Sequence, residues 1–93
     1  MFPEEKVNAI RNHLKSEFPN HEIVSDEGLD FVKFRLTSKG KRYLINFEGS
    51  FIDDRNPSEL ANYLQRRPFS WLLHREDSLE VVVTSSGRQM LVH

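Results

Sequence analysis

The stretch that decides the fold is Phe31–Phe47, which reads Phe-Val-Lys-Phe-Arg-Leu-Thr-Ser-Lys-Gly-Lys-Arg-Tyr-Leu-Ile-Asn-Phe. Apolar and polar residues alternate on both sides of Lys39-Gly40, and a period of two is typical of β-strands with one buried face. Glycine readily adopts the positive φ that a two-residue hairpin turn requires. The stretch therefore predicts a β-hairpin whose turn is Lys39-Gly40.

This turn determines which residues of the two strands face one another. It places three apolar pairs on one face of the hairpin, namely Leu36–Tyr43, Phe34–Ile45 and Val32–Phe47. A shift of the register by one residue would pair arginine with tyrosine and break the apolar face. The opposite face is predicted to carry polar side chains, namely Lys33, Arg35, Thr37, Arg42 and Asn46, with Lys39 and Lys41 near the tip.

The segment before the hairpin is predicted to form a helix and a short strand. Apolar residues recur at helical spacing from Val7 to Phe18. Pro3 suits the first helical position, and Pro19 ends the helix because the residue before a proline avoids helical backbone angles. We expect a strand at residues 21–25 and a turn at 26–28.

The segment after the hairpin is predicted to add a second helix and a C-terminal hairpin. A polar loop at 53–55 leads to Asn56-Pro57-Ser58-Glu59, a strong helix start with a cap, a first-turn proline and a capping-box glutamate. Residues 69–75 are expected to add one or two helical turns. The strand at 79–84 contains three consecutive valines, which indicates an interior strand buried on both faces. Residues 88–93 would return as the final strand.

The order of these elements is helix, three strands, helix and C-terminal β-hairpin. We therefore predict a single small α+β domain over residues 1–93, with both helices packed on one face of an antiparallel-rich sheet. A chain of 93 residues suffices for one domain. Its seven Phe, two Tyr and one Trp are enough to build a core.

The composition excludes several classes of function. The chain has no cysteine, which removes disulfides and thiolate metal sites. Its first residues lack the basic and apolar segments of a secretory signal, and no apolar run is long enough to span a bilayer. We therefore expect a cytoplasmic protein with no membrane partner.

The charge distribution indicates a candidate polyanion-binding surface. The net charge is −1, yet residues 31–48 carry five basic groups and one acidic group. Clustered cations bind phosphate groups irrespective of base sequence. The candidate polyanion-binding residues are Lys33, Arg35, Lys41 and Arg42 of the hairpin, together with Arg66 and Arg67. The alternative is an ordinary solvated sheet face.

The apolar cluster that contains Phe69 and Trp71 is a candidate partner-binding surface. Aromatic residues and arginine dominate binding hot spots, and Arg66-Arg67 precede this cluster. The alternative is that the cluster completes the core, because a small domain needs its only Trp inside.

Two known families share this order of elements. Residues 1–67 are similar in element order to the double-stranded RNA-binding domain, whose second helix opens with lysines; here that helix opens with Asn56 after two aspartates. The order with the following strand also looks like the core of PD-(D/E)xK nucleases, in which two carboxylates hold Mg²⁺ beside a lysine. Asp30 and Glu48 lie near the places of those carboxylates, but the sequence after Glu48 lacks the lysine.

No catalytic or metal-binding constellation emerges from the sequence. The histidines form no helical metal pair and the glycines are isolated, so we predict no enzyme, no metal and no cofactor. We favour a non-enzymatic protein-binding, adaptor or regulatory module, whose partner is another protein or a second copy. The alternatives are a nucleic-acid-binding domain that uses the basic face of residues 31–47 and, more remotely, a Mg²⁺-dependent nuclease-like fold.

Overall fold

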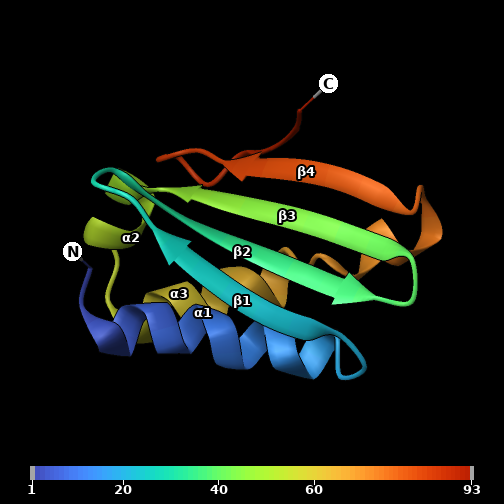
Figure 1. Cartoon of the computed structure of the whole chain (residues 1–93). Helices are drawn as coiled ribbons and strands as arrows, with labels where there is room; N and C mark the ends of the chain where they lie inside the picture. The colour runs from blue at the N-terminus through green and yellow to red at the C-terminus, as the bar shows by residue number, and fades with distance from the viewer. Residues whose placement is uncertain (1, 93) are drawn as a thin grey trace.

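The structure is a computed structural model that describes residues 2–92. The chain forms a five-stranded sheet of order β1-β2-β3-β4-β5, and the helices lie on one face of it (Figure 1). The elements are α1 Glu4–Glu17, β1 Glu22–Glu27, β2 Phe31–Ser38, β3 Lys41–Glu48, α2 Gly49–Asp53, α3 Pro57–Arg66, the 3₁₀ helix η1 Ser70–His74, β4 Ser78–Val83 and β5 Gln89–Leu91. The predicted α+β fold is confirmed. His93, which ended the predicted final strand, lies outside the described residues.

The β2–β3 hairpin has the predicted register. Phe34 lies opposite Ile45, and the two neighbouring apolar pairs are also as predicted. Lys39 and Gly40 have φ angles of 30° and 81°, and two successive positive values are what a type I′ turn requires. All six side chains of the apolar face are fully buried. The local sequence therefore sets the centre of the sheet.

The pairing of β3 with β4 is parallel, whereas the other described strand pairs are antiparallel. β4 lies between β3 and β5, which confirms its predicted interior position. A parallel pair requires a crossover connection, and here the crossover contains α2, α3 and η1. The crossover brings α3 alongside α1 under the sheet (Figure 1).

The core lies between the helices and the covered face of the sheet. Phe47 is at its centre, because its ring packs against the rings of Phe34, Phe51 and Phe69 with centroid distances of 5.8, 5.5 and 6.0 Å. Buried residues of the helices surround these rings, including Val7, Ile10, Leu14, Ile52, Leu60 and Leu64. Burial of each such side chain stabilises the fold by about 1.5–3 kcal/mol before entropy is counted.

The ends of the first helix and first strand differ from the prediction. Pro3 is the N-cap of α1 and not its first helical residue, because its ψ of 132° is extended. β1 continues to Glu27, which pairs with Val32, so the turn predicted at 26–28 begins later. The acidic residues at the end of β1 are tolerated there because their side chains are exposed.

Two features after the hairpin also differ from the prediction. The segment at Gly49–Asp53, for which no element was predicted, forms the short helix α2 with Phe51 and Ile52 buried. β4 is not buried on both faces: Val81 and Val83 are fully buried, whereas Val82 is only half-buried. The reason is that the helices cover one face of the sheet, so alternate residues of β4 point away from the core.

Polar side chains cap the starts of two helices within the crossover. The Asn56 side chain accepts a hydrogen bond of 2.8 Å from the Glu59 amide, and Glu59 Oε1 accepts one of 3.0 Å from the Asn56 amide. This is the predicted capping box at the start of α3. At the start of η1, Glu17 Oε1 accepts hydrogen bonds from the amides of Phe69 and Ser70 at 2.8 and 2.9 Å.

Candidate functional site

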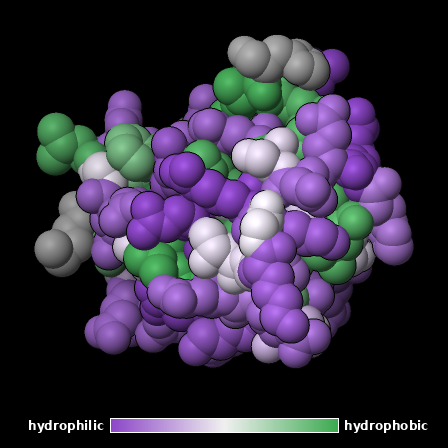
Figure 2. All heavy atoms as spheres, turned by 45° about the vertical axis from the view of Figure 1, so that its right-hand side comes forward, coloured by the Kyte–Doolittle hydropathy of each residue, from purple (hydrophilic) through white to green (hydrophobic). Residues whose placement is uncertain are grey.

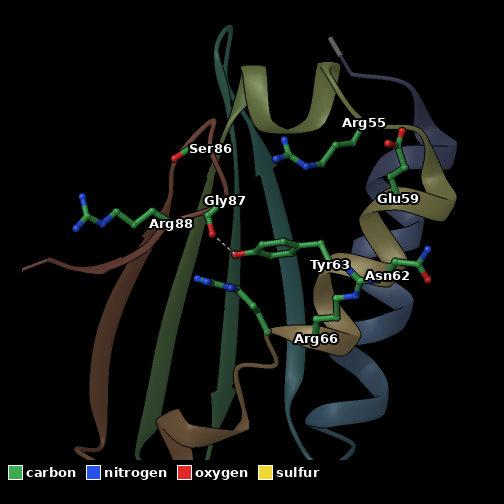
Figure 3. A pocket seen from close by; sticks show the side chains of 9 residues that line it. Arg55, Glu59, Asn62, Tyr63, Arg66, Ser86, Gly87 and Arg88 are labelled. Carbon is green, nitrogen blue, oxygen red and sulfur yellow. Dashed lines mark hydrogen bonds between the residues drawn. The ribbon is translucent and has the colours of Figure 1, made fainter.

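A pocket rich in arginine lies between α3 and the turn that joins β4 to β5. Its volume is about 620 Å³, and it is open to solvent on one side. Figure 3 shows α3 on one side of the pocket and the Ser86–Arg88 turn on the other. The lining residues are Arg55, Glu59, Asn62, Tyr63, Arg66, Arg67, Ser86, Gly87 and Arg88. We call this region the arginine pocket.

Arg55 is held in place by the protein. Its Nη1 donates hydrogen bonds of 3.0 and 3.1 Å to the carbonyl oxygens of Phe51 and Ser85. Its guanidinium carbon lies 4.2 Å from the centroid of the Phe51 ring, a cation–π contact. Figure 3 shows the side chain extending toward the Ser86–Gly87 turn. The charge of Arg55 is therefore fixed at one end of the pocket.

Tyr63 forms the floor between α3 and the turn. Its hydroxyl donates a hydrogen bond of 2.8 Å to the Gly87 carbonyl oxygen and accepts one of 3.3 Å from the Gln89 side chain. Burial raises the pKa of Tyr63, while the Gln89 hydrogen bond and the charges of Arg67 and Arg55 act in the opposite direction. The charges of two arginines of the pocket therefore favour the ionised form of this hydroxyl, against the effect of burial.

The turn opposite α3 has its own supports. Glu48 Oε1 accepts a hydrogen bond of 2.9 Å from the Ser85 amide, and Thr84 Oγ1 accepts one of 3.2 Å from the Arg88 amide. Gly87 has a φ of 89°, which side-chain-bearing residues rarely adopt. Figure 3 shows that Arg88 extends away from Tyr63, toward the outer rim.

The arginine pocket carries an excess of positive charge. It contains four arginines, and its only acidic lining residue is Glu59, which already serves the capping box of α3. The ion pairs found among residues 2–92 are His13–Glu17 and Lys33–Glu80, and neither involves the pocket. A localised excess of guanidinium groups is the arrangement that binds carboxylate and phosphate groups.

The predicted polyanion-binding residues fall into three places. Arg66 and Arg67 are exposed and line the arginine pocket. Lys33, Arg35 and Arg42 lie on the uncovered face of the sheet, where strand alternation puts them. Lys41 alternates onto the same side as Tyr43 and contributes to the lowered pKa of His21, so it does not join the other hairpin cations.

The uncovered sheet face is mixed in charge. Lys33 Nζ lies 3.8 Å from Glu80 Oε2, and Lys33 is also paired across the strands with Asp26. Arg42 lines a second hollow, of about 450 Å³, together with Arg75, Glu76 and Glu80. Acidic groups therefore accompany the basic groups on this face. The surface seen in Figure 2 is mainly hydrophilic, with small separate apolar patches.

The predicted partner-binding aromatics differ in their exposure. Phe69 is fully buried and belongs to the core around Phe47, so its ring is not available at the surface. Trp71 is half-buried and packs against the edge of that core. The Arg75 guanidinium carbon lies 5.9 Å from the centroid of the Trp71 ring. Of the two, only Trp71 offers part of its side chain to a partner.

Arg55 and Arg88 are the two arginines of the pocket that sequence reasoning missed. Arg55 sits in a polar loop next to two aspartates, and Arg88 follows a serine-rich turn. The net charge of segments along the sequence does not reveal either arginine, because the turn and α3 are distant in the sequence and come together only in the folded chain. The only local signal was the turn Ser86-Gly87, which places Arg88 directly after it.

Asp30 and Glu48, the two residues compared above with the metal-binding carboxylates of nucleases, are both exposed. Glu48 is a hydrogen-bond acceptor for the Ser85 amide. The backbone carbonyl of Asp30 accepts a hydrogen bond of 2.7 Å from the Gly49 amide, which closes the end of the β2–β3 ladder. In the part of the chain that the structure describes, no three His, Asp or Glu side chains gather in a group that could hold a metal ion.

Comparison with known protein families finds no match for this chain, and comparison with curated proteins finds none either. What is established is therefore the class of molecule: a small α+β domain with a five-stranded mixed sheet. Across residues 2–92, none of the helices has the length and apolar content needed to cross a bilayer.

Proposed function

We propose that this protein is a non-enzymatic binding module that recognises an anionic segment of a partner protein through the arginine pocket. The observation that carries the proposal is the gathering of four arginines in one pocket whose only acid caps a helix. Uncompensated guanidinium groups on a surface attract acidic partners and orient them as they approach. The cytoplasmic location expected from the sequence is part of this proposal.

The local character of the positive charge favours a protein partner over a nucleic acid. A nucleic-acid strand needs a basic track that follows successive phosphates. On the uncovered sheet face, Glu80 and Asp26 interrupt such a track beside Lys33. Asp53 and Asp54 are exposed immediately before Arg55 and would repel a strand that ran past the arginine pocket.

The chemistry of the pocket supports binding without catalysis. Its potential general base, Glu59, is part of a capping box, and the Tyr63 hydroxyl donates to a backbone carbonyl. Burial also raises the pKa of Tyr63, so this hydroxyl stays protonated at neutral pH. Arginine itself does not exchange protons in this range. The described groups of the pocket therefore hold an anion better than they move a proton.

A fluorescence-anisotropy titration tests the proposal with a labelled glutamate-rich peptide. The pocket variant combines Arg66→Glu with Arg67→Glu, and the matched control combines Arg35→Glu with Arg42→Glu on the uncovered sheet face. We expect the pocket variant to weaken binding at least roughly tenfold, as loss of charged hydrogen bonds implies, while the control retains affinity.

Two results would overturn the proposal. In one, the sheet-face variant abolishes peptide binding while the pocket variant does not. In the other, the peptide fails to bind while a single-stranded DNA of similar length binds with a steep salt dependence, with a log–log slope of about −3 for four phosphate contacts. That second result would assign the arginines to nucleic-acid recognition.

A further inference from the structure

We infer that the group bound in the arginine pocket is a phosphate monoester, carried on a phosphorylated side chain of the partner. This inference rests on the proposed function and specifies its ligand. One arginine is enough to pair with a carboxylate in a bidentate manner. Four arginines line the pocket, and three of them remain for the ligand when Arg88, which extends toward the outer rim, is set aside. Several guanidinium groups suit a group that carries nearly two charges and three acceptor oxygens.

Arg55 is the anchor of the proposed phosphate site. Its Nη1 is already bonded to two carbonyl oxygens, and the other guanidinium nitrogens make no hydrogen bond with the described residues. The ring of Phe51 holds the plane of the guanidinium group. Because its rotamers are restricted before binding, Arg55 loses little entropy when it meets the ligand.

Gly87 brings the turn close to this anchor and to the floor of the pocket. A Cβ atom at residue 87 would lie 3.1 Å from Tyr63 Cε2 and 3.7 Å from Arg55 Nη2. The glycine therefore lets the turn lie close to the aromatic floor and beside Arg55 Nη2, which makes no hydrogen bond with the described residues.

The exposed arginines complete the site from α3. Arg66 and Arg67 are consecutive at the end of the helix, and both line the pocket. Arg67 lines the pocket together with Tyr63, and its charge acts to lower the pKa of the Tyr63 hydroxyl. Arg55 from the loop and Arg67 from the end of α3 therefore line the same pocket from different elements. Two planar donor groups from different directions suit a tetrahedral anion better than a planar carboxylate.

The test compares three peptides of one sequence, which carry phosphoserine, glutamate or serine at a single central position. Affinities are measured by calorimetry for the wild type and for Arg67→Lys, which keeps the charge and removes the planar fork. Arg35→Lys on the uncovered sheet face is the matched control. Because Arg67 is exposed, we expect its variant to remain folded, and amide spectra verify this.

We expect the phosphoserine peptide to bind roughly tenfold or more tightly than the glutamate peptide, and Arg67→Lys to remove most of that difference. Equal affinities for the phosphoserine and glutamate peptides would overturn the phosphate inference and leave the proposed function standing. Absence of binding by both peptides would overturn the inference and the proposed function together. A phosphoserine preference that Arg67→Lys leaves intact, and Arg35→Lys removes, would place the phosphate site elsewhere.

Discussion

The hydroxyl of Tyr63 donates a 2.8 Å hydrogen bond to the carbonyl oxygen of Gly87, and this bond joins α3 to the turn between β4 and β5. The bond connects segments that are 24 residues apart in the sequence. It also sets the width of the arginine pocket, because each partner belongs to one of the two walls. The stability of the turn and the geometry of the anion site are therefore linked.

Removal of this hydroxyl by Tyr63→Phe is expected to destabilise the protein by about 1 kcal/mol, the net value of a typical intramolecular hydrogen bond. Tyr43→Phe is the matched control, because the buried Tyr43 hydroxyl has no hydrogen-bond partner among the described residues. Its removal should be neutral or stabilising. Urea unfolding monitored by circular dichroism measures both, and equal losses in the two variants would contradict the assigned role of Tyr63.

The Gly87→Ala substitution is expected to destabilise the protein by more than the same change at Gly40. Both glycines have positive φ, 89° and 81°, so each substitution costs about 1–2 kcal/mol of backbone strain. A Cβ at residue 87 would also lie 3.1 Å from Tyr63 Cε2, whereas one at residue 40 meets nothing within 4 Å. Chemical denaturation gives the comparison. A larger loss of unfolding free energy for Gly40→Ala would mean that the Tyr63 ring moves away from the new Cβ atom at no cost.

The Phe34→Ala substitution is expected to lower the free energy of unfolding by about 3–5 kcal/mol, the usual cost of deleting a buried aromatic ring. Phe34 is fully buried and packs edge-to-face on Phe47. Arg35→Ala, one residue along on the opposite face, should change stability by at most about 0.5 kcal/mol. Unfolding in guanidinium chloride measures the free energy of unfolding of both variants. A larger loss for Arg35→Ala than for Phe34→Ala would refute the hairpin register.

The stability of the protein is expected to fall as the pH is lowered below about 6.5, the ordinary pKa of histidine, in part because of His21. Burial, and then the charge of Lys41, lower the pKa of His21 in the folded state. The unfolded chain therefore binds this proton more tightly, so the stabilisation is complete above the unfolded pKa and is lost as the pH falls toward the folded value.

His21→Phe should therefore flatten the dependence of thermal stability on pH between about 7 and 5. The ring can be replaced by another aromatic one because it packs against the rings of Phe18 and Tyr43. His74→Phe, at an exposed position, is the control and should retain the wild-type profile. Identical profiles for wild type and His21→Phe would rule out this histidine as a source of the effect.

The sequence was sufficient to predict the features that depend on neighbouring residues. Lys39-Gly40 determined a turn, and the turn determined three buried pairs. Asn56 and Glu59 are three residues apart, and their capping box forms as predicted. In each case the interaction lies within a few residues, so local preferences and the final structure agree.

The features that were missed depend on distant parts of the chain. α2 is only five residues long, too short for a helical repeat, and the burial of Phe51 depends on the rings of Phe47 and Tyr63. The parallel direction of β4 is set by the crossover and not by its own residues. The arginine pocket combines residues of the loop, the helix and the turn, so clustering of charge along the sequence revealed only Arg66 and Arg67 of its cations.

The parallel pairing of β3 with β4 implies an order of events in folding. β1, β2 and β3 form a meander of adjacent segments with small loop-closure entropy, whereas β4 can join only after a crossover with three helical segments has been placed. We therefore expect Ile45→Val to slow refolding and Val81→Ala mainly to accelerate unfolding in stopped-flow measurements. If Val81→Ala slowed refolding as strongly as it destabilised the native state, β4 would belong to the folding nucleus.

In the expected order, the wall of the arginine pocket that follows β4 is assembled last, and the anion site exists only in the fully folded chain.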